Sequence, residues 1–286
     1  MNFKYACLVS LVVTLSLGTC TALKAGEKLL ENVSYASVLE LPYQQPKAKI
    51  AYGKDPLQYG LLWLPPAKKQ EHQQEPAVVV FIHGGCWLNA YDIKHSYAAA
   101  SALANAGYAV WSLEYRRSGD IGGGWPGTFE DIIAGIDYLD KLAEHSIDLT
   151  KVVLSGHSAG GHLALLAGAL KQNISGVIGL AAIADIETYA RGENSCQKAA
   201  PRFMGGTYRE RIQAYDNANP IKRSLHLKSL LLQGDADGIV PEAQASKTVI
   251  PHLIVARAGH FDWLHPDSKA FSVFLAELNK VFPNDL

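Results

Sequence analysis

The sequence lacks the features that would point to a charged partner. No run of like charges, internal repeat or low-complexity stretch interrupts its 286 residues, and the formal net charge is −1 at pH 7. A chain so nearly neutral offers no electrostatic attraction for nucleic acid or for an anionic membrane surface. Hydrophobic residues make up 48% and charged residues 19%, which is ordinary globular composition. We therefore expect a single domain that is large enough to bury an extended core.

Cysteine is scarce, and its spacing argues against a structural zinc site. The four cysteines form no CxxC motif and no cluster with histidine, as such a site would need. Cys7 and Cys20 fall near the N-terminus, whereas Cys86 and Cys196 lie within the body of the chain. In an oxidising compartment the second pair can form a disulfide. Two separate buried thiols are the alternative.

The hydrophobic run at the N-terminus is too short for a comfortable membrane span. Lys4 precedes the apolar residues 6–17, and small residues follow, which is the order found in a secretory signal peptide. We expect residues 1–22 to be a signal peptide and residues 23–286 to form one globular domain. The signal would export this domain to the periplasm or the medium. An uncleaved anchor or an N-terminal core helix is the alternative.

The cleavage site stays open. Residues 17–20 (Leu-Gly-Thr-Cys) resemble a bacterial lipoprotein signal, with threonine where glycine, alanine or serine is usual. A lipid on Cys20 would then be the protein's membrane contact. Cleavage after Ala22 or Ala25 by an ordinary signal peptidase is the competing possibility.

Strand and helix patterns alternate along the rest of the chain. The β-branched run 77–82 has the length of a strand buried on both faces. The alternation predicts an α/β fold, in which helices flank both faces of a mostly parallel central sheet. It breaks between about residues 185 and 227, where we expect a small cap. The other expected strands are 49–52, 58–64, 108–113, 151–155, 177–181, 229–232 and 253–256, and the expected helices are 97–105, 129–143, 160–170 and 268–281.

Residues 156–160 (Gly-His-Ser-Ala-Gly) fit the G-x-S-x-G nucleophile elbow. The pattern needs glycine on both sides because the strand-to-helix turn is tight and a Cβ at either flank would collide. An apolar strand leads directly into the motif, and an apolar helix leaves it. Ser158 is therefore the candidate nucleophile.

Residues 83–87 (His-Gly-Gly-Cys-Trp) directly follow the strand at 77–82. Glycine allows the backbone N–H groups of such a loop to approach a substrate oxygen. The candidate donors are Gly84, Gly85 and Cys86, with the amide of Ala159 from the start of the following helix as their partner. We expect His83 to orient the loop.

A serine nucleophile needs a base, and the base needs an orienting acid. In proteins with this elbow the acid and then the histidine follow the serine in the chain. His260 lies just past the last expected strand and is the candidate base, with His265 as a weaker one. Asp237 is the candidate acid, and Asp235 is the alternative. We expect His157 and His162, which flank the elbow, to be structural.

Two tryptophans are candidates for the wall of a substrate pocket. Trp87 follows the glycine loop, and Trp125 lies in the glycine-rich segment 119–127. Residues 114–117 (Glu-Tyr-Arg-Arg) open that segment. Their charges can anchor the loop through ion pairs or contact a substrate.

Taken in order, these motifs resemble the signature blocks of the α/β-hydrolase superfamily, especially its esterase and kynurenine-formamidase-like branch. The catalytic domains of the prolyl-oligopeptidase class are a more distant match. The resemblance covers residues 50–286 and implies Ser158, Asp237 and His260 as the triad. Two departures are Cys86, where the formamidases commonly carry tyrosine, and Glu114, where aspartate is more frequent.

The predicted reaction is acyl transfer to water through an acyl-enzyme, which requires no metal or cofactor. A small or medium carboxylic ester is the first choice of substrate. An aryl-formamide or other amide is the second, and a short peptide is the third. The alternative from another class is a ligand-binding protein that has the fold without catalysis.

Overall fold

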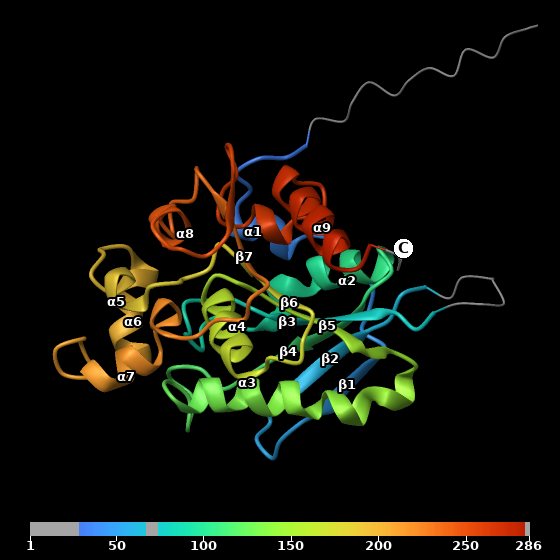
Figure 1. Cartoon of the computed structure of the whole chain (residues 1–286), viewed down its shortest axis with the longest axis horizontal. Coiled ribbons are helices and arrows are strands. Elements are labelled where there is room, and N and C mark those ends of the chain that lie inside the picture. The colour runs from blue at the N-terminus through green and yellow to red at the C-terminus, as the bar shows by residue number, and fades with distance from the viewer. Residues whose placement is uncertain (1–28, 67–73, 284–286) are drawn as a thin grey trace, which may run out of the picture.

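The computed structural model describes residues 29–66 and 74–283 (Figure 1). Its described strands form one sheet in the order β1-β2-β4-β3-β5-β6-β7-β8. β2 pairs antiparallel with β1 and β4, and all other neighbours are parallel. The mostly parallel sheet expected from the alternating pattern is therefore confirmed. The strands are β1 (Ala48–Ala51), β2 (Tyr59–Trp63), β3 (Ala77–Ile82), β4 (Ala109–Leu113), β5 (Asp148–His157), β6 (Gly176–Leu180), β7 (Ser229–Gly234) and β8 (His252–Val255).

Helices cover both faces of this sheet (Figure 1). α2 (Tyr97–Asn105) and α9 (Lys269–Val281) share one hydrophobic cluster with the sheet. α3 (Gly127–Asp137) and α4 (Ala159–Leu170) share the other. The two clusters make this a three-layer fold with a core on each side of the sheet.

The central strand β3 explains why its sequence is a continuous apolar run. Val78 and Val80 belong to the cluster beneath α3 and α4, whereas Val79 and Phe81 belong to the cluster beneath α2 and α9. Successive side chains of a strand point to opposite faces. Because both faces are covered by helices, every position of β3 is apolar and buried.

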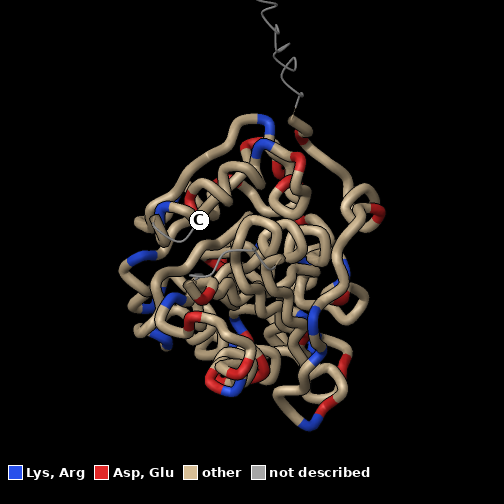
Figure 2. The backbone as a smooth tube through the Cα atoms, turned by 90° about the vertical axis from the view of Figure 1, so that its right-hand side faces the viewer, with Lys and Arg blue, Asp and Glu red and all other residues tan. Residues whose placement is uncertain are grey.

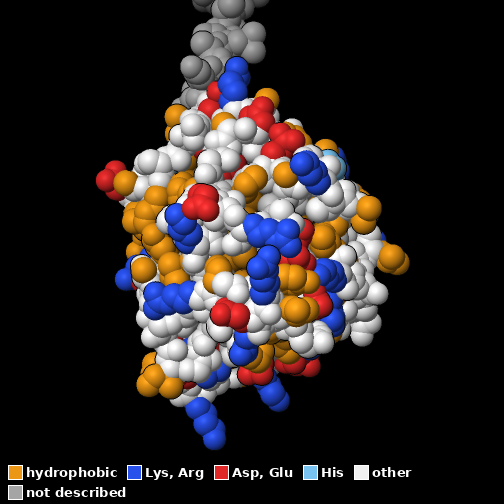
Figure 3. Space-filling model, turned by 90° about the vertical axis from the view of Figure 1, so that its left-hand side faces the viewer, with side chains coloured by type: hydrophobic (Ala, Val, Ile, Leu, Met, Phe, Trp, Pro, Cys, Tyr) orange, Lys and Arg blue, Asp and Glu red, His pale blue; other side chains and the backbone are white. Residues whose placement is uncertain are grey.

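The expected cap lies between β6 and β7. It consists of α5 (Ile186–Tyr189), α6 (Ser195–Met204), α7 (Ile212–Asn217) and the 3₁₀ turn η3 (Pro220–Lys222). Figure 3 views the molecule from the side on which these cap helices lie in Figure 1, and hydrophobic, basic and acidic side chains are intermingled on this face. Figure 2 shows charges of both signs distributed along the backbone.

The helix expected over residues 129–143 differs from the prediction. α3 ends at Asp137, and the chain continues as the 3₁₀ helix η2 (Tyr138–His145). Its buried residues Leu139 and Leu142 are three positions apart, which places them on one side of a 3₁₀ helix. The apolar spacing is therefore compatible with the change of helix type.

Four short elements complete the described chain. They are α1 (Tyr35–Leu39), η1 (Ile93–Ser96), α8 (Ala243–Ser246) and η4 (Asp262–Leu264). No helix within the described ranges is long and apolar enough to cross a membrane. The expected signal peptide, residues 1–22, lies outside these ranges.

Candidate active site

Ser158 occupies the turn between β5 and α4 with φ 56° and ψ −121°. Residues other than glycine rarely adopt such a conformation, and it is held only where the surroundings enforce it. A Cβ on Gly156 would lie 2.3 Å from the Gly160 carbonyl oxygen, and one on Gly160 would lie 2.1 Å from the Ile82 carbonyl oxygen. The two flanking glycines are thus required by close backbone contacts. They allow the turn to present the serine at the carboxyl ends of the parallel strands.

His260 lies in the loop after β8, where its Nδ1 is 2.8 Å from Asp237 Oδ2. The side chain of Asp237 is fully buried, and its Oδ1 accepts backbone hydrogen bonds from Ile239 and Val240, both at 2.8 Å. Because the carboxylate fixes a proton on Nδ1, the other ring nitrogen, Nε2, is left to accept one.

The remaining acid and histidine candidates have other partners. Asp235 accepts a hydrogen bond from the Arg257 backbone N–H at 2.5 Å, whereas the ring of the base bonds to Asp237. His265 Nδ1 accepts from the Asp267 backbone at 3.3 Å within its own turn. The structure therefore pairs His260 with Asp237.

The two histidines that flank the serine are buried and donate to carbonyl groups. His157 Nε2 lies 2.8 Å from the His260 carbonyl oxygen, and His162 Nε2 lies 2.7 Å from that of Ala218. Burial lowers the pKa of His162 to about 4 and, together with the nearby His260, lowers the pKa of His157 well below its usual range. Both rings are therefore neutral at pH 7. His157 thus ties the elbow to the loop that carries His260, here called the base loop, and His162 ties it to the end of the cap.

The glycine loop after β3 packs directly against the elbow. A Cβ on Gly84 would lie 2.9 Å from the His157 carbonyl oxygen and 3.1 Å from Ser158 Cβ. Gly85 and Cys86 then have positive φ values of 109° and 54°. This loop thus lies next to the candidate nucleophile.

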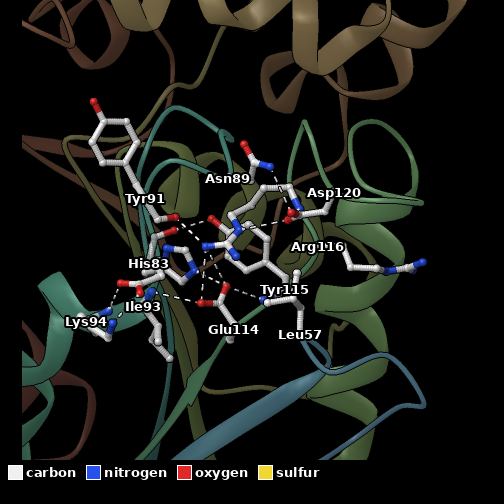
Figure 4. A network of polar contacts seen from close by, with 12 residues as sticks. Leu57, His83, Asn89, Tyr91, Ile93, Lys94, Glu114, Tyr115, Arg116 and Asp120 are labelled. Atoms are coloured by element: carbon white, nitrogen blue, oxygen red, sulfur yellow. Dashed lines mark hydrogen bonds and ion pairs between the residues drawn. The ribbon is translucent and has the colours of Figure 1, made fainter.

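A polar network centred on the buried side chains of His83 and Glu114 holds the start of that loop (Figure 4). His83 Nε2 is 3.0 Å from Glu114 Oε1, and His83 Nδ1 is 2.7 Å from the Gly84 carbonyl oxygen. Tyr115 Oη donates to the His83 carbonyl oxygen at 2.8 Å. Both ring nitrogens of His83 thus lie within hydrogen-bond distance of an oxygen. His83 therefore belongs to the support of the loop, as expected.

Glu114 is the centre of this network. Its carboxylate accepts from the backbone amides of Ile93 and Tyr115 and pairs with Arg117 Nη1 at 3.3 Å. Burial alone would raise the pKa of Glu114, but His83 and Arg117 outweigh it and hold that pKa below its usual range. The carboxylate is therefore ionised at pH 7.

The two arginines of residues 114–117 anchor loops rather than face the serine. Arg117 is buried and donates to the Tyr91 carbonyl oxygen at 2.6 Å. Arg116 binds the buried carboxylate of Asp131 through Nε and Nη2 at 2.8 and 2.6 Å. Of the two possibilities for this charge cluster, the structure favours loop anchoring.

A cavity of about 160 Å³ lies beside Ser158. Its wall is mainly aromatic, aliphatic or sulfur-containing, apart from the histidines and the serines. The lining residues are Tyr35, Gly85, Cys86, Tyr91, His95, His157, Ser158, Ser195, Cys196, Ile239, His260 and Phe261.

Neither tryptophan expected in the pocket wall lines this cavity. Trp87 is fully buried and stacks on Phe203 with ring centroids 4.9 Å apart. Trp125 packs on Phe129 and on the edge of Phe203. Trp87 has a positive φ of 57°, and its indole lies in the core beneath the cap. Both tryptophans therefore pack against Phe203 of the cap helix α6.

Cys86 and Cys196 are joined in a disulfide, with Cα atoms 5.0 Å apart. The bond links the glycine loop to α6 of the cap, and both cysteines line the cavity. The sequence left open whether these cysteines form a disulfide or are two separate thiols, and the structure has the disulfide. The described residues contain no group of His, Cys, Asp and Glu side chains arranged to hold a metal ion.

Sequence reasoning missed several residues of the cavity wall. Tyr35, Tyr91, Ile239 and Phe261 line the cavity, but they lie far apart in the chain. Only Phe261, adjacent to the candidate base, carried a local signal of its position.

The sheet order, the serine on its strand-to-helix turn and the His–Asp pair after the last strands define an α/β-hydrolase. The family model BD-FAE matches residues 62–250, which is more than half of the chain. The chain therefore belongs to the BD-FAE family, on the esterase side of the α/β-hydrolase superfamily.

Individual relatives agree with this placement. Esterase LipC of Mycobacterium tuberculosis is 25% identical over 279 residues, which cover 82% of this chain and 66% of that relative. A crystal structure of esterase B from Lactobacillus rhamnosis superposes with a TM-score of 0.72 at 20% identity, covering 86% of this chain and 89% of that one. A truncated carbohydrate esterase from gut microbiota gives 0.69 at 19% identity, with coverage of 85% and 98%.

Proposed function

We propose that this protein is an exported serine esterase that cleaves small to medium carboxylic esters. The observation that carries the proposal is that Ser158 and His260 line the same cavity, with His260 hydrogen-bonded to the buried Asp237. Ser158 lies on a strained turn. The esterase names of the relatives support ester rather than amide substrates.

In this mechanism His260 Nε2 takes the Ser158 proton as the hydroxyl attacks the ester carbonyl carbon. Asp237 keeps the imidazole in the required tautomer and stabilises the imidazolium. His260 then protonates the departing alcohol, which leaves an acyl group on Ser158. Water, activated by the same histidine, releases the acid and restores the serine.

The negative charge that develops on the carbonyl oxygen needs fixed donors. We assign them to backbone N–H groups of the loop Gly84, Gly85 and Cys86 and to Ala159 at the N-terminus of α4. Preorganised amides are strongly stabilising where water is excluded. The packing of Gly84 against the elbow and the buried network under His83 support this assignment.

We further propose that residues 1–22 direct export to the periplasm or the medium. The disulfide between Cys86 and Cys196 supports an oxidising compartment. A lipid on Cys20 is the second form that the exported protein can take, and intact-mass measurement of the mature chain distinguishes the two.

Covalent labelling tests the nucleophile directly. A fluorophosphonate should add one phosphonyl group to the folded protein, and peptide mass spectrometry should place it on Ser158. The Ser158→Ala variant should stay unlabelled, whereas Ser246→Ala, which alters an exposed serine, should label like the parent. Labelling at another residue, or none on folded parent protein, would contradict the assignment.

A further inference from the structure

The segment of residues 29–40, here called the N-terminal segment, runs beside the loop that carries the candidate base. Leu30 donates through its backbone to the Asp267 carbonyl oxygen at 3.1 Å and accepts from Lys269 at 3.4 Å. Figure 1 shows this blue segment and α1 close to the red helix α9. It precedes residues 62–250, which match the family model.

A single buried carboxylate joins this segment to the base loop. Asp262 Oδ2 accepts from the backbone N–H groups of Asn32 at 2.7 Å and Gly259 at 3.1 Å, and Oδ1 accepts from Val33 at 2.6 Å. Asp262 is 1% exposed. Gly259 directly precedes His260, so the carboxylate ties the segment to the residue next to the base.

The segment and the base loop are also in steric contact. A Cβ on Gly259 would lie 2.3 Å from Asn32 Oδ1 and 2.9 Å from Asn32 Cα. Asn32 itself has a positive φ of 52°, which asparagine tolerates better than most residues. No side chain fits at position 259 while the segment keeps its place.

The same segment brings an aromatic ring to the substrate cavity. Tyr35 is the first residue of α1, after the N-cap Ser34, and it lines the cavity together with Ser158 and His260. Its ring centroid lies 5.3 Å from that of Phe261 and 5.8 Å from that of Tyr91. The Tyr35 ring is thus packed against two other residues of the cavity wall.

We propose that the N-terminal segment is part of the active site. Tyr35 limits the substrate group that fits the cavity, and Asp262 is a positioning residue that holds His260 by fixing the segment against Gly259. The inference rests on the proposed esterase function and names a specificity residue for it. Cleavage after Ala22 or Ala25, or a lipid on Cys20, would each retain the segment.

The specificity role is tested with two ester series on the full chain, one varying the acyl group of p-nitrophenyl esters and one varying the alcohol of acetate esters. Removing the ring in Tyr35→Ala enlarges the cavity. In at least one series, the ratio of kcat/KM for the longest to the shortest substrate should rise by about tenfold, the worth of one aromatic contact. Tyr35→Phe keeps the ring and should retain the parent profile.

A matched control comes from the neighbouring Tyr43, which packs on Tyr97 and does not line the cavity. Tyr43→Ala should keep the parent profile in both series. Unchanged profiles in Tyr35→Ala, or an equal change in Tyr43→Ala or Tyr35→Phe, would overturn the specificity role.

The positioning role is tested with Asp262→Asn, whose amide N–H group repels one of the backbone donors. We expect kcat to fall by about tenfold with little change in KM, a shift of the kind that misplacing a catalytic group produces, and the pH profile of kcat/KM to change because it reports the base. If Asp262→Asn does not fold, Gly259→Ala takes its place: the added Cβ displaces Asn32, and we expect the same fall in kcat and the same change in the pH profile. A folded variant with the parent's kcat and pH profile would overturn the role.

Different results would contradict the esterase function and the role of the N-terminal segment. A folded parent protein that hydrolyses no ester and takes no label at Ser158 defeats the esterase function itself. A parent that hydrolyses and labels, with Tyr35→Ala and Asp262→Asn indistinguishable from it, defeats the role of the N-terminal segment alone.

Discussion

At the residue scale, two aspartates near the end of β7 compete for the role of orienting acid. Only Asp237 reaches His260, at 2.8 Å, with two backbone amides and Gln233 Nε2 around its carboxylate. Asp235 is exposed and bonds to the backbone of Arg257. A two-residue difference in the loop thus separates a catalytic candidate from a turn-stabilising side chain.

Asp237→Asn should lower kcat for p-nitrophenyl acetate by about 10³- to 10⁴-fold, because the amide favours the wrong imidazole tautomer. Asp235→Asn should retain nearly all activity, since its side chain only bonds to a backbone amide. Steady-state kinetics of both variants checks the pair. Equal losses, or a loss confined to Asp235→Asn, would contradict the assignment.

Local patterns predicted the residues whose roles depend on local backbone geometry. Gly156 and Gly160 follow from the tight turn alone, and the structure shows the close contacts that require them. Tyr35 could not be found in this way. Its position depends on contacts made through Asp262, more than two hundred residues away, and no local pattern encodes such a distant contact.

At the element scale, the disulfide fastens the glycine loop to the cap. The bonded Cys86 and Cys196 are separated by 110 positions, and they bring together two segments that both line the cavity. A cross-link stabilises chiefly by restricting the unfolded chain, with an upper value of about 4 to 5 kcal/mol for a loop of this length.

The Cys86→Ser/Cys196→Ser variant should therefore be less stable than the parent by up to about 4 to 5 kcal/mol. Urea unfolding with and without reductant measures this difference. The parent should lose stability in reductant, whereas the double variant should not respond to it. A parent whose urea midpoint is the same in both conditions would show that the bond contributes nothing.

Elements were predictable where the pattern was long and continuous. The strand β3 matches its expected bounds because it is an unbroken apolar run that is buried on both faces. β5 contains the expected residues 151–155 but extends beyond them at both ends, and α4 begins one residue before the expected 160–170. The cap was expected only as a region. Its helices are short, and α6 contains Pro201 and begins with a capping box of Asn194 and Gln197, so tertiary contacts define them more than hydrophobic periodicity does.

At the scale of the whole molecule, buried histidines couple stability to pH. Burial lowers the pKa of His95 to about 3, with nearby His83 adding to the effect, and that of His162 to about 4. In the unfolded chain a histidine titrates near 6.5. Between these values the unfolded state binds more protons, so stability decreases as the pH falls through 6.5.

Each of these histidines should lower the free energy of unfolding by about 2 kcal/mol between pH 7.5 and pH 5. Thermal unfolding followed from pH 8 to pH 4.5 should therefore show a steady fall in Tm that begins below about pH 6.5. His162→Gln removes one such group and should flatten the profile. A Tm that does not change down to pH 5, or an unaltered slope in the variant, would contradict the coupling.

Ester hydrolysis by this protein should depend on Ser158. We would measure turnover of a p-nitrophenyl acyl series, from acetate to longer chains, beside N-formylkynurenine, for the parent, Ser158→Ala and the control Ser246→Ala. We expect ester turnover that is lost in Ser158→Ala, retained in Ser246→Ala and faster than turnover of the formamide. Turnover that persists in Ser158→Ala, or no turnover of any ester by folded parent protein, would contradict the assignment of Ser158 as the esterase nucleophile.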